Sequence, residues 1–317
     1  MSGIRGARTA SIALVVALAL AGCSGGDGDG DTEALPTATD SWPAQPSPTA
    51  SPTLSPQEYR AELIAATYDL EVALDEVARA DGMDALDVAI GEAAVAADAG
   101  AVALSAVEPP DDAAVEHADL TTALEDLGTD LTDLQTAMEL SEVCAPSSTL
   151  GRLGASENLA AVAGVSRALG DKGYDMTLTL PSFPEERTRR LDNGTFVADG
   201  SRNGLGELTI DNGTSSDTVV TLARGDDAAF AVYVRAESEF TVYSISDASY
   251  TIYYASGADW DSETESFTRD CGFSRFEGEA AFETTSSTYT TYSITLHPVE
   301  DGNATTRPVD PEEFPDL

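Results

Sequence analysis

The spacing of apolar residues changes once along this chain, and that change constrains the fold more than any other feature. Between residues 56 and 170, apolar side chains recur every three or four positions, as an α-helix requires. Four segments show this spacing, beginning near residues 56, 84, 111 and 156. Each apolar stripe needs a partner and the loops are short, so we expect an antiparallel helical bundle over residues 56–170.

The first helix has a clear start signal. Ser55, Pro56 and Glu58 form the pattern of a capping box, in which serine caps the helix and glutamate reaches back to the cap. Pro109 and Pro110 end the second helical segment, because proline removes a backbone donor and disfavours helix before itself.

From Gly206 the apolar period becomes two, which is typical of β-strands. Seven or eight short runs rich in Val, Ile, Thr, Tyr and Phe follow, with Asn212-Gly213 and Gly225-Asp226 as turn signals. This pattern predicts an antiparallel β-sandwich over residues 206–300. The predicted fold class is therefore α+β and multidomain, with a connector at 171–205 and a C-terminal tail at 301–317.

The N-terminus has the pattern of a secretory signal peptide over residues 1–22. Arg5 and Arg8 precede an apolar run from Ala10 to Leu20. That run is shorter than the roughly 18 residues that span a bilayer, and we expect no later segment to span one.

The residues Leu20-Ala21-Gly22-Cys23 resemble the bacterial lipobox. The resemblance implies cleavage before Cys23 and a lipid on its sulfur, in which acyl chains such as palmitate serve as the membrane anchor. It thereby implies a lipoprotein on the extracellular face of the cell membrane. An ordinary secretory cleavage site with an incidental cysteine is the alternative.

Residues 23–55 form a tether. They are rich in Pro, Ser and Thr after an acidic Gly/Asp run, and such a composition cannot build a packed core. We expect a disordered linker, either bare or glycosylated.

The formal net charge of −40 excludes some partners. A nucleic acid needs cations along its phosphates, and a basic membrane-surface patch is equally absent from the sequence. The expected partners are the membrane, through the lipid on Cys23, and a protein or cell-wall glycan. One basic cluster, Arg187, Arg189 and Arg190, lies in the connector, where it either docks on the acidic bundle or stays solvated.

Three cysteines become two once Cys23 carries lipid. Outside the membrane the remaining pair, Cys144 and Cys271, favours a disulfide that ties two regions of the chain together. The alternative is two separately buried thiols.

The run from Phe240 to Tyr254 resembles the strand–turn–strand of PEGA and carboxypeptidase-regulatory-like modules. Tyr250 stands at the tyrosine position of that pattern, whereas Ala248-Ser249 occupies the turn where glycine is usual. The resemblance implies a small extracellular β-sandwich that acts as a surface or binding module without catalysis. The whole layout resembles actinobacterial cell-surface lipoproteins, which implies a location and an architecture but no activity.

The sequence offers little catalytic chemistry. His117 and His297 are the two histidines, and neither lies near a nucleophile elbow, a zinc motif or a phosphate loop. We therefore expect no catalytic residues and no enzyme. No cofactor is expected, with Ca²⁺ as the one open possibility.

The acidic run around Asp259, Asp261 and Glu263 is the calcium candidate, because alternate carboxylates on a bent loop suit Ca²⁺. Thr264 stands where an EF-hand would require glycine, so the alternative is a charged turn on a strand edge.

Tyr254 and Trp260 are the candidate binding aromatics, since exposed rings on a sheet can stack on sugars or anchor a protein. Cross-strand pairs on a half-buried face are the alternative. The predicted function is a non-catalytic binding, sensing or scaffold module. The alternatives are a Ca²⁺-binding β-sandwich domain and an envelope hydrolase.

Overall fold

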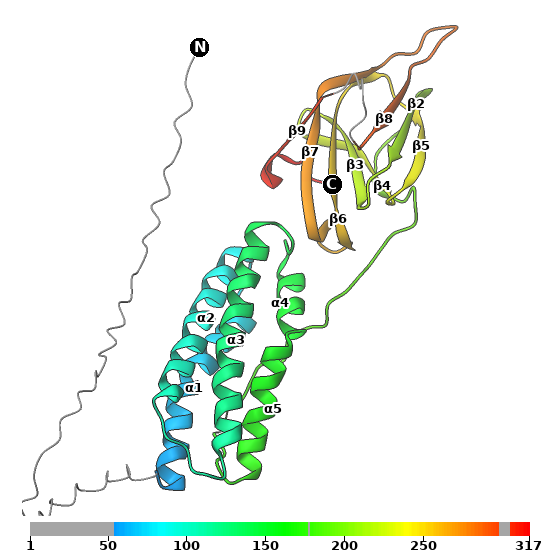
Figure 1. Cartoon of the computed structure of the whole chain (residues 1–317). Helices are drawn as coiled ribbons and strands as arrows, with labels where there is room; N and C mark the ends of the chain where they lie inside the picture. The colour runs from blue at the N-terminus through cyan, green and yellow to red at the C-terminus, as the bar shows by residue number, and fades with distance from the viewer. Residues whose placement is uncertain (1–53, 177, 298–304) are drawn as a thin grey trace, which may run out of the picture. The chain divides into compact units, whose positions relative to one another are not determined.

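A computed structural model describes residues 54–176, 178–297 and 305–317 of the chain. The predicted signal peptide, the lipidation residue Cys23 and nearly all of the predicted tether lie outside these residues. The described chain has helices first and strands afterwards (Figure 1). The change of apolar period therefore does mark a change of secondary structure, and the mixed α+β class is confirmed.

Within the described ranges, five α-helices make up the helical part. Contacts link α1 with α2, α2 with α3, and α3 with both α4 and α5. In chain order the helices are α1 (Pro56–Arg79), α2 (Met83–Ser105), α3 (Ala114–Glu139), α4 (Pro146–Gly154) and α5 (Glu157–Asp171).

The predicted capping box of α1 is present. Ser55 Oγ accepts from the Glu58 backbone N–H at 3.3 Å, and Glu58 Oε2 accepts from the Ser55 backbone N–H at 2.9 Å. The fourth predicted helix corresponds to α5, with Ser156 as its N-cap. No apolar period predicted α4, because a nine-residue helix is too short to repeat an apolar stripe.

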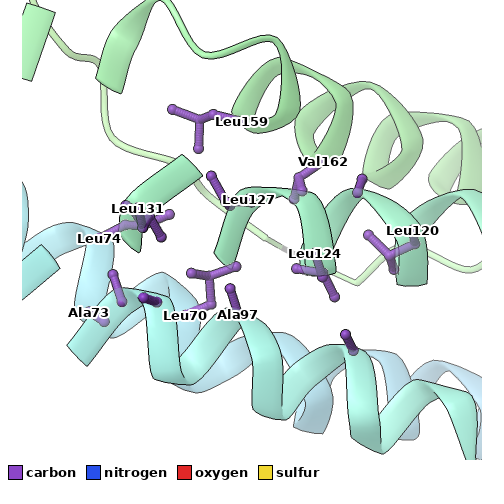
Figure 2. Packing of buried hydrophobic residues seen from close by; sticks show 14 of the residues in the cluster. Leu70, Ala73, Leu74, Ala97, Leu120, Leu124, Leu127, Leu131, Leu159 and Val162 are labelled. Atoms are coloured by element: carbon purple, nitrogen blue, oxygen red, sulfur yellow. The ribbon is translucent and has the colours of Figure 1, made fainter. Parts of the chain in front are cut away.

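Leucines and alanines form the core of the helical part (Figure 2). The alanines and glycines of α2 let the helices approach closely. A Cβ on Gly100 would lie 2.5 Å from the backbone oxygen of Ala66 in α1, so this crossing tolerates no side chain. Labelled core residues in Figure 2 include Leu70 and Leu74 of α1, Ala97 of α2, Leu124 and Leu131 of α3, and Leu159 and Val162 of α5.

The helix α2 bears on the prediction that no segment after the N-terminal apolar run spans a membrane. By length and composition alone it could cross a membrane, with a mean hydropathy of 1.5 over its most apolar window. Of that window, 44% is buried inside the protein.

The described residues of the β part contain nine strands, which form two sheets. The six-stranded sheet has the order β1-β4-β3-β6-β7-β9, and the three-stranded sheet has the order β5-β2-β8. The strands are β1 (Phe196–Asp199), β2 (Gly206–Asn212), β3 (Asp217–Arg224), β4 (Asp227–Val234), β5 (Ser238–Ile245), β6 (Ala248–Asp261), β7 (Ser266–Phe282), β8 (Thr291–Thr295) and β9 (Thr306–Pro308).

Several strand predictions need correction. Where short strands were expected, β7 runs unbroken over 17 residues, and β6 continues into the expected acidic turn as far as Asp261. The strand β1 lies inside the expected connector, and β9 lies inside the expected tail. The pairing is not wholly antiparallel either, because β2 and β8 run parallel. Sequence patterns identify strands by their buried faces, and they carry no information on strand direction.

Side chains from both sheets share one apolar cluster, which includes Leu208 and Ile210 of β2 and Val220 and Leu222 of β3. The opposite face of the six-stranded sheet carries a second cluster around Val219, Tyr233 and Trp260, with Phe314 and Leu317 of the C-terminal segment packed against it. Since successive strand residues face opposite sides, this arrangement explains why seven of the eight residues of β3 are buried.

Candidate functional site: a cleft beside the Arg189 clamp

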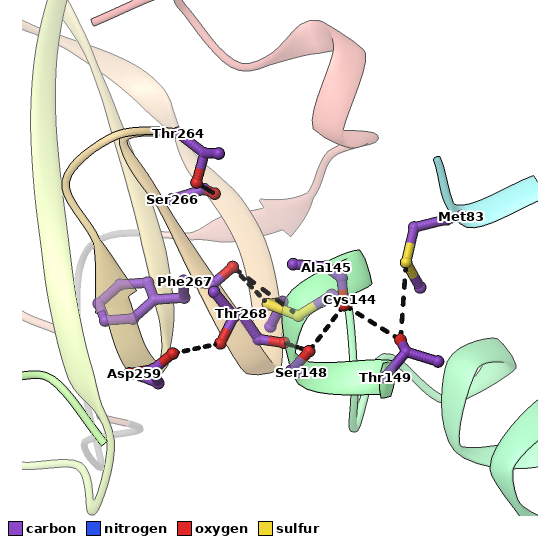
Figure 3. Close-up of a disulfide and its surroundings, with 11 residues drawn as sticks. Met83, Cys144, Ala145, Ser148, Thr149, Asp259, Thr264, Ser266, Phe267 and Thr268 are labelled. Atoms are coloured by element: carbon purple, nitrogen blue, oxygen red, sulfur yellow. Dashed lines mark hydrogen bonds between the residues drawn. A yellow bond between two sulfur atoms is a disulfide. The ribbon is translucent and has the colours of Figure 1, made fainter. Parts of the chain in front are cut away.

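The predicted disulfide is present. Cys144 and Cys271 are bonded to each other across 127 positions of sequence (Figure 3). The backbone on either side pairs as well, since the Cys144 N–H donates to Thr268 O at 2.9 Å and the Cys271 N–H donates to Ser141 O at 3.0 Å. An isolated antiparallel bridge joins Val143 to Arg269. The backbone of the segment after α3 therefore pairs with the edge of β7.

The helix α4 starts at this connection. Ser148 Oγ donates to Thr268 O at 2.6 Å, and Thr149 Oγ1 lies 3.8 Å from the Met83 sulfur at the start of α2 (Figure 3). Hydroxyl groups of one short helix thus contact both β7 and α2.

Arg189 of the connector binds the buried carboxylate of Asp259, and we call this arrangement the Arg189 clamp. Its Nε and Nη2 atoms donate to the two oxygens of Asp259 at 2.9 and 2.6 Å, and its backbone N–H donates to Oδ1 at 2.7 Å. The Thr268 hydroxyl adds a bond to Oδ2 at 2.7 Å. Arg189 Nη1 also pairs with Asp261 at 3.0 Å. One guanidinium therefore pairs with two of the three predicted metal ligands.

The backbone at Asp259 explains how its side chain reaches Arg189. Its φ is 57°, in the left-handed region that aspartate tolerates better than most residues, and the register with β7 shifts between Ser256 and Ala258. Such bulges re-aim side chains. Gly257 lies beside the bulge, where a Cβ would come within 2.6 Å of the Phe267 Cβ.

Burial alone would raise the pKa of Asp259, but the bonds from Arg189 and Thr268 lower it to about 2. The hydrogen bond from the Glu263 backbone N–H lowers the pKa of Asp261, and Arg189 lowers it further. Burial raises this pKa, but by less. Both groups are therefore carboxylates at neutral pH.

Arg190 makes a second ion pair of the same kind. Its Nε and Nη2 atoms lie 2.6 and 2.5 Å from the two oxygens of Asp217, which also accepts from the Tyr233 hydroxyl at 2.5 Å and the Ala236 N–H at 2.8 Å. Burial opposes ionisation of Asp217, yet these donors lower its pKa. Burial of the Tyr233 hydroxyl, together with its hydrogen bond to the Asp217 carboxylate, raises the pKa of Tyr233.

These contacts correct the prediction for the basic cluster. Arg189 and Arg190 bind the β part, rather than docking on the helical part or staying solvated. The physical reason is local: Asp217 and Asp259 are buried carboxylates, which need a partner more than solvated helix carboxylates do. Arg187 is different, because it is exposed and no ion pair of its side chain occurs within the described ranges.

A cleft of about 560 Å³ lies beside the clamp. The start of α4, the connector and the β6–β7 turn contribute its walls. Its polar lining consists of hydroxyls, carboxylates and two guanidinium groups, with Trp260 and Leu191 among the few apolar residues. The lining residues are Ser147, Ser148, Pro184, Glu185, Arg187, Arg189, Leu191, Asp259, Trp260, Asp261, Ser262 and Glu263.

The predicted calcium ligands do not converge. Asp259 and Asp261 face Arg189, while Glu263 contributes only its backbone N–H to Asp261, at 3.0 Å. Across the described ranges, no group of three or more His, Cys, Asp or Glu residues is arranged to hold a metal ion. The cation that these carboxylates bind is a side chain of the chain itself.

The predicted binding aromatics are not exposed rings. Trp260 is 2% exposed and packs edge-on against Tyr233 and Phe267, because its side chain faces the second apolar cluster. Tyr254 is half-buried against Phe276. The more exposed tyrosines of the β part are Tyr243 at 58% and Tyr289 at 48%. Strand alternation could not assign these faces, because the six-stranded sheet is buried on both sides.

The histidines lie away from the cleft. His117 is buried in the helical part, with its Nδ1 3.0 Å from the Tyr59 hydroxyl and its Nε2 3.1 Å from Leu104 O. His297 follows β8 and does not line the cleft. The sequence did not predict the cleft. The arginine cluster in an otherwise acidic chain was the one sequence signal that pointed to the Arg189 clamp.

Comparison of this chain with protein-family models, curated proteins and solved structures gave no match.

Proposed function

We propose that this chain is a non-catalytic binding module of the cell envelope, anchored by lipid on Cys23 and built as a helical bundle followed by a β-sandwich. The observation that supports this function is the cleft beside the Arg189 clamp. Its walls are fixed by an ion pair and lie close to a disulfide, while Arg187 on the same wall has an exposed guanidinium without an ion pair in the described structure. A pre-formed polar cleft with unpaired charges is suited to binding.

The chemistry of the lining favours binding over hydrolysis. Three serines and several carboxylates line the cleft, but no histidine, lysine or cysteine does. A serine nucleophile needs an adjacent base. A glycosidase needs one carboxyl group with a raised pKa as its general acid. Asp259 and Asp261 have lowered pKa values, which is the opposite of that requirement.

The charges of the cleft indicate the class of ligand. Arg187 can bind a carboxylate, whereas Glu185 and Glu263 can bind an ammonium group, and Ser147 and Ser262 can hydrogen-bond to hydroxyls. A cell-wall glycan fragment that bears a short peptide carries all three groups. We infer that such a fragment is the ligand, in keeping with an anchor on the outer face of the membrane.

Titration calorimetry of the full chain with a soluble peptide-bearing wall glycan fragment tests this function. We expect saturable binding that Arg187→Ala weakens about tenfold, since a charge-assisted contact contributes roughly 1.5 kcal/mol or more. Arg167→Ala is the matched control, because Arg167 is also exposed and without an ion pair but lies on α5. Equal weakening by both variants, or no binding by the wild type, would contradict the proposal.

The anchor is tested separately by Cys23→Ser. A lipid on this residue predicts that the wild type stays with the membrane fraction and that the variant does not. If both proteins fractionate with the membrane, the lipid is not the anchor.

A further inference from the structure

The outer face of α2 carries a regular apolar seam. Val88, Val95 and Val102 are 61%, 70% and 69% exposed, and they lie seven residues apart. This spacing places them on one side of the helix, with the exposed Ala85 one turn before Val88 and the exposed Ala99 between Val95 and Val102. We call these five residues the α2 seam.

The core does not require these valines. The opposite side of α2 supplies the buried residues, among them Ile90, Ala97 and Leu104. Valine is also a poorer helix former than alanine, so helix propensity gives no reason to place it on an exposed surface. Single exposed apolar residues are ordinary. Three at heptad spacing, on the described helix that is apolar enough to cross a membrane, form a row along one side of that helix.

Acidic residues border the seam. Asp84, Asp87, Glu92 and Asp98 are all exposed, and α2 contains no lysine or arginine. None of the four forms an ion pair with any residue that the structure describes. Glu92, four residues after Val88 and three before Val95, lies on the valine side itself, so this side of α2 combines apolar side chains with negative charge.

This charge pattern disfavours a second copy of the chain as the occupant. In a parallel pair of α2 helices in register, Glu92 would face the Glu92 of the other copy. In an antiparallel pair centred on Val95, it would face Asp98, which lies equally far from the centre. Like charges at such positions are destabilising. An anionic lipid surface is disfavoured for the same reason, since membrane-surface helices carry Lys and Arg on their polar face.

We propose that the α2 seam docks an amphipathic helix of a partner protein, whose apolar residues cover the valines and whose lysines or arginines pair with the acidic residues. The seam from Val88 to Val102 is about 21 Å long, which matches roughly four turns of a partner helix. The small side chains of Ala85 and Ala99, each one turn from a valine of the seam, allow the two backbones to approach closely there. This docking surface is separate from the cleft, so its test does not depend on the function proposed for the cleft.

The test uses the purified full chain and a dye-labelled synthetic helix of about 20 residues. The probe has leucines on one stripe and lysines beside them, and its matched partner has glutamates in place of the lysines. Fluorescence anisotropy is expected to show saturable binding of the lysine peptide only. Val95→Gln should weaken that binding about tenfold, because it removes an apolar contact at the centre of the seam without changing the net charge.

Val115→Gln is the control, since Val115 is 69% exposed on the neighbouring helix α3 and receives the same chemical change. It should change the affinity less than about twofold, and far-ultraviolet circular dichroism checks that both variants fold. Equal losses in the two variants, or no loss in either, would show attraction by net charge alone and overturn the proposal. So would failure of the lysine peptide to bind. Sedimentation as a dimer that Val95→Gln dissociates would assign the seam to a second copy, and flotation with vesicles that Val95→Gln abolishes would assign it to lipid.

Discussion

Arg189 holds Asp259 from two directions, with its guanidinium on both carboxylate oxygens and its own backbone N–H on one of them. Asp259 is 4% exposed, so its charge depends on this partner rather than on water. The connector is therefore attached to the end of β6 by a residue that a sequence pattern would assign to a solvated linker.

Arg189→Ala is expected to destabilise the protein by about 2–4 kcal/mol, because it leaves a buried carboxylate without its cation. Arg187→Ala, two positions away and exposed, should change the free energy of unfolding by less than about 0.5 kcal/mol. Urea unfolding of both variants measures the difference. Similar losses in the two variants would mean that the connector is held mainly by contacts other than this ion pair.

Calcium should raise the Tm of Arg189→Ala but not that of the wild type. Among the residues that the structure describes, the wild type has no group of carboxylates arranged to hold a metal, so millimolar Ca²⁺ should leave its Tm unchanged. In Arg189→Ala the carboxylates of Asp259 and Asp261 lose their cation, and Ca²⁺ should then raise the Tm of the variant. A Tm rise in the wild type that matches the variant's would restore the calcium site predicted from the acidic run.

Acid should weaken the wild type through Asp259. The folded protein lowers the pKa of Asp259 from 3.8 to about 2, so the unfolded state binds its proton first as the pH falls. The stabilisation is complete above pH 4 and is lost between about pH 4 and 2, and it amounts to about 2 kcal/mol at 1.36 kcal/mol per unit. Asp259→Asn should therefore be less stable than the wild type at pH 7, with a difference that shrinks towards pH 2. A difference that is constant across this range would assign the loss to packing instead of charge.

The elements of this fold were predictable to different degrees, for physical reasons. An element that buries one face repeats apolar residues at the helical or strand period. This is why α1, α2, α3 and α5 and most strands could be predicted. The helix α4 and the strand β9 are too short to show a period. The parallel pairing of β2 with β8 depends on contacts between distant segments, which no local pattern encodes.

The site was less predictable than the fold. The sequence identified Asp259, Asp261 and the arginine cluster as unusual, and it identified the pairing of Cys144 with Cys271. It could not match Arg189 to Asp259, because 70 residues separate them and the chain offers dozens of other carboxylates. Nor could it show that Trp260 faces inward, since that follows from a C-terminal segment that packs on the second face of the sheet.

The disulfide should contribute substantially to stability. It closes a loop of 127 positions, and cross-links of this kind stabilise by about 2–4 kcal/mol, mainly by restricting the unfolded chain. A reducing agent should therefore lower the Tm of the wild type. The double variant Cys144→Ser, Cys271→Ser should melt at the lower temperature with or without the reductant. If reduction leaves the wild-type Tm unchanged, the backbone pairing at Thr268 and Ser141 holds this connection without the covalent bond.

Two asparagines with the same local sequence should respond differently to the same change. Asn193 and Asn212 both precede Gly-Thr, but Asn193 is exposed whereas Asn212 is fully buried. Asn212 Nδ2 donates to the backbone oxygens of Ser216, Val234 and Arg235 at 3.0–3.1 Å. Asn212→Asp would set a carboxylate against three carbonyls, so we expect a loss of about 3 kcal/mol at pH 7.

Asn193→Asp is the matched control, because its Nδ2 makes one bond, to Glu239 O at 3.0 Å, in contact with solvent. Its loss should stay below about 1 kcal/mol. Below about pH 4 the protonated acid regains a donor, so the deficit of Asn212→Asp relative to Asn193→Asp should narrow. Equal losses at pH 7, measured by urea unfolding, would mean that water reaches residue 212 and that its three carbonyl contacts do not set the geometry of the β2–β3 turn.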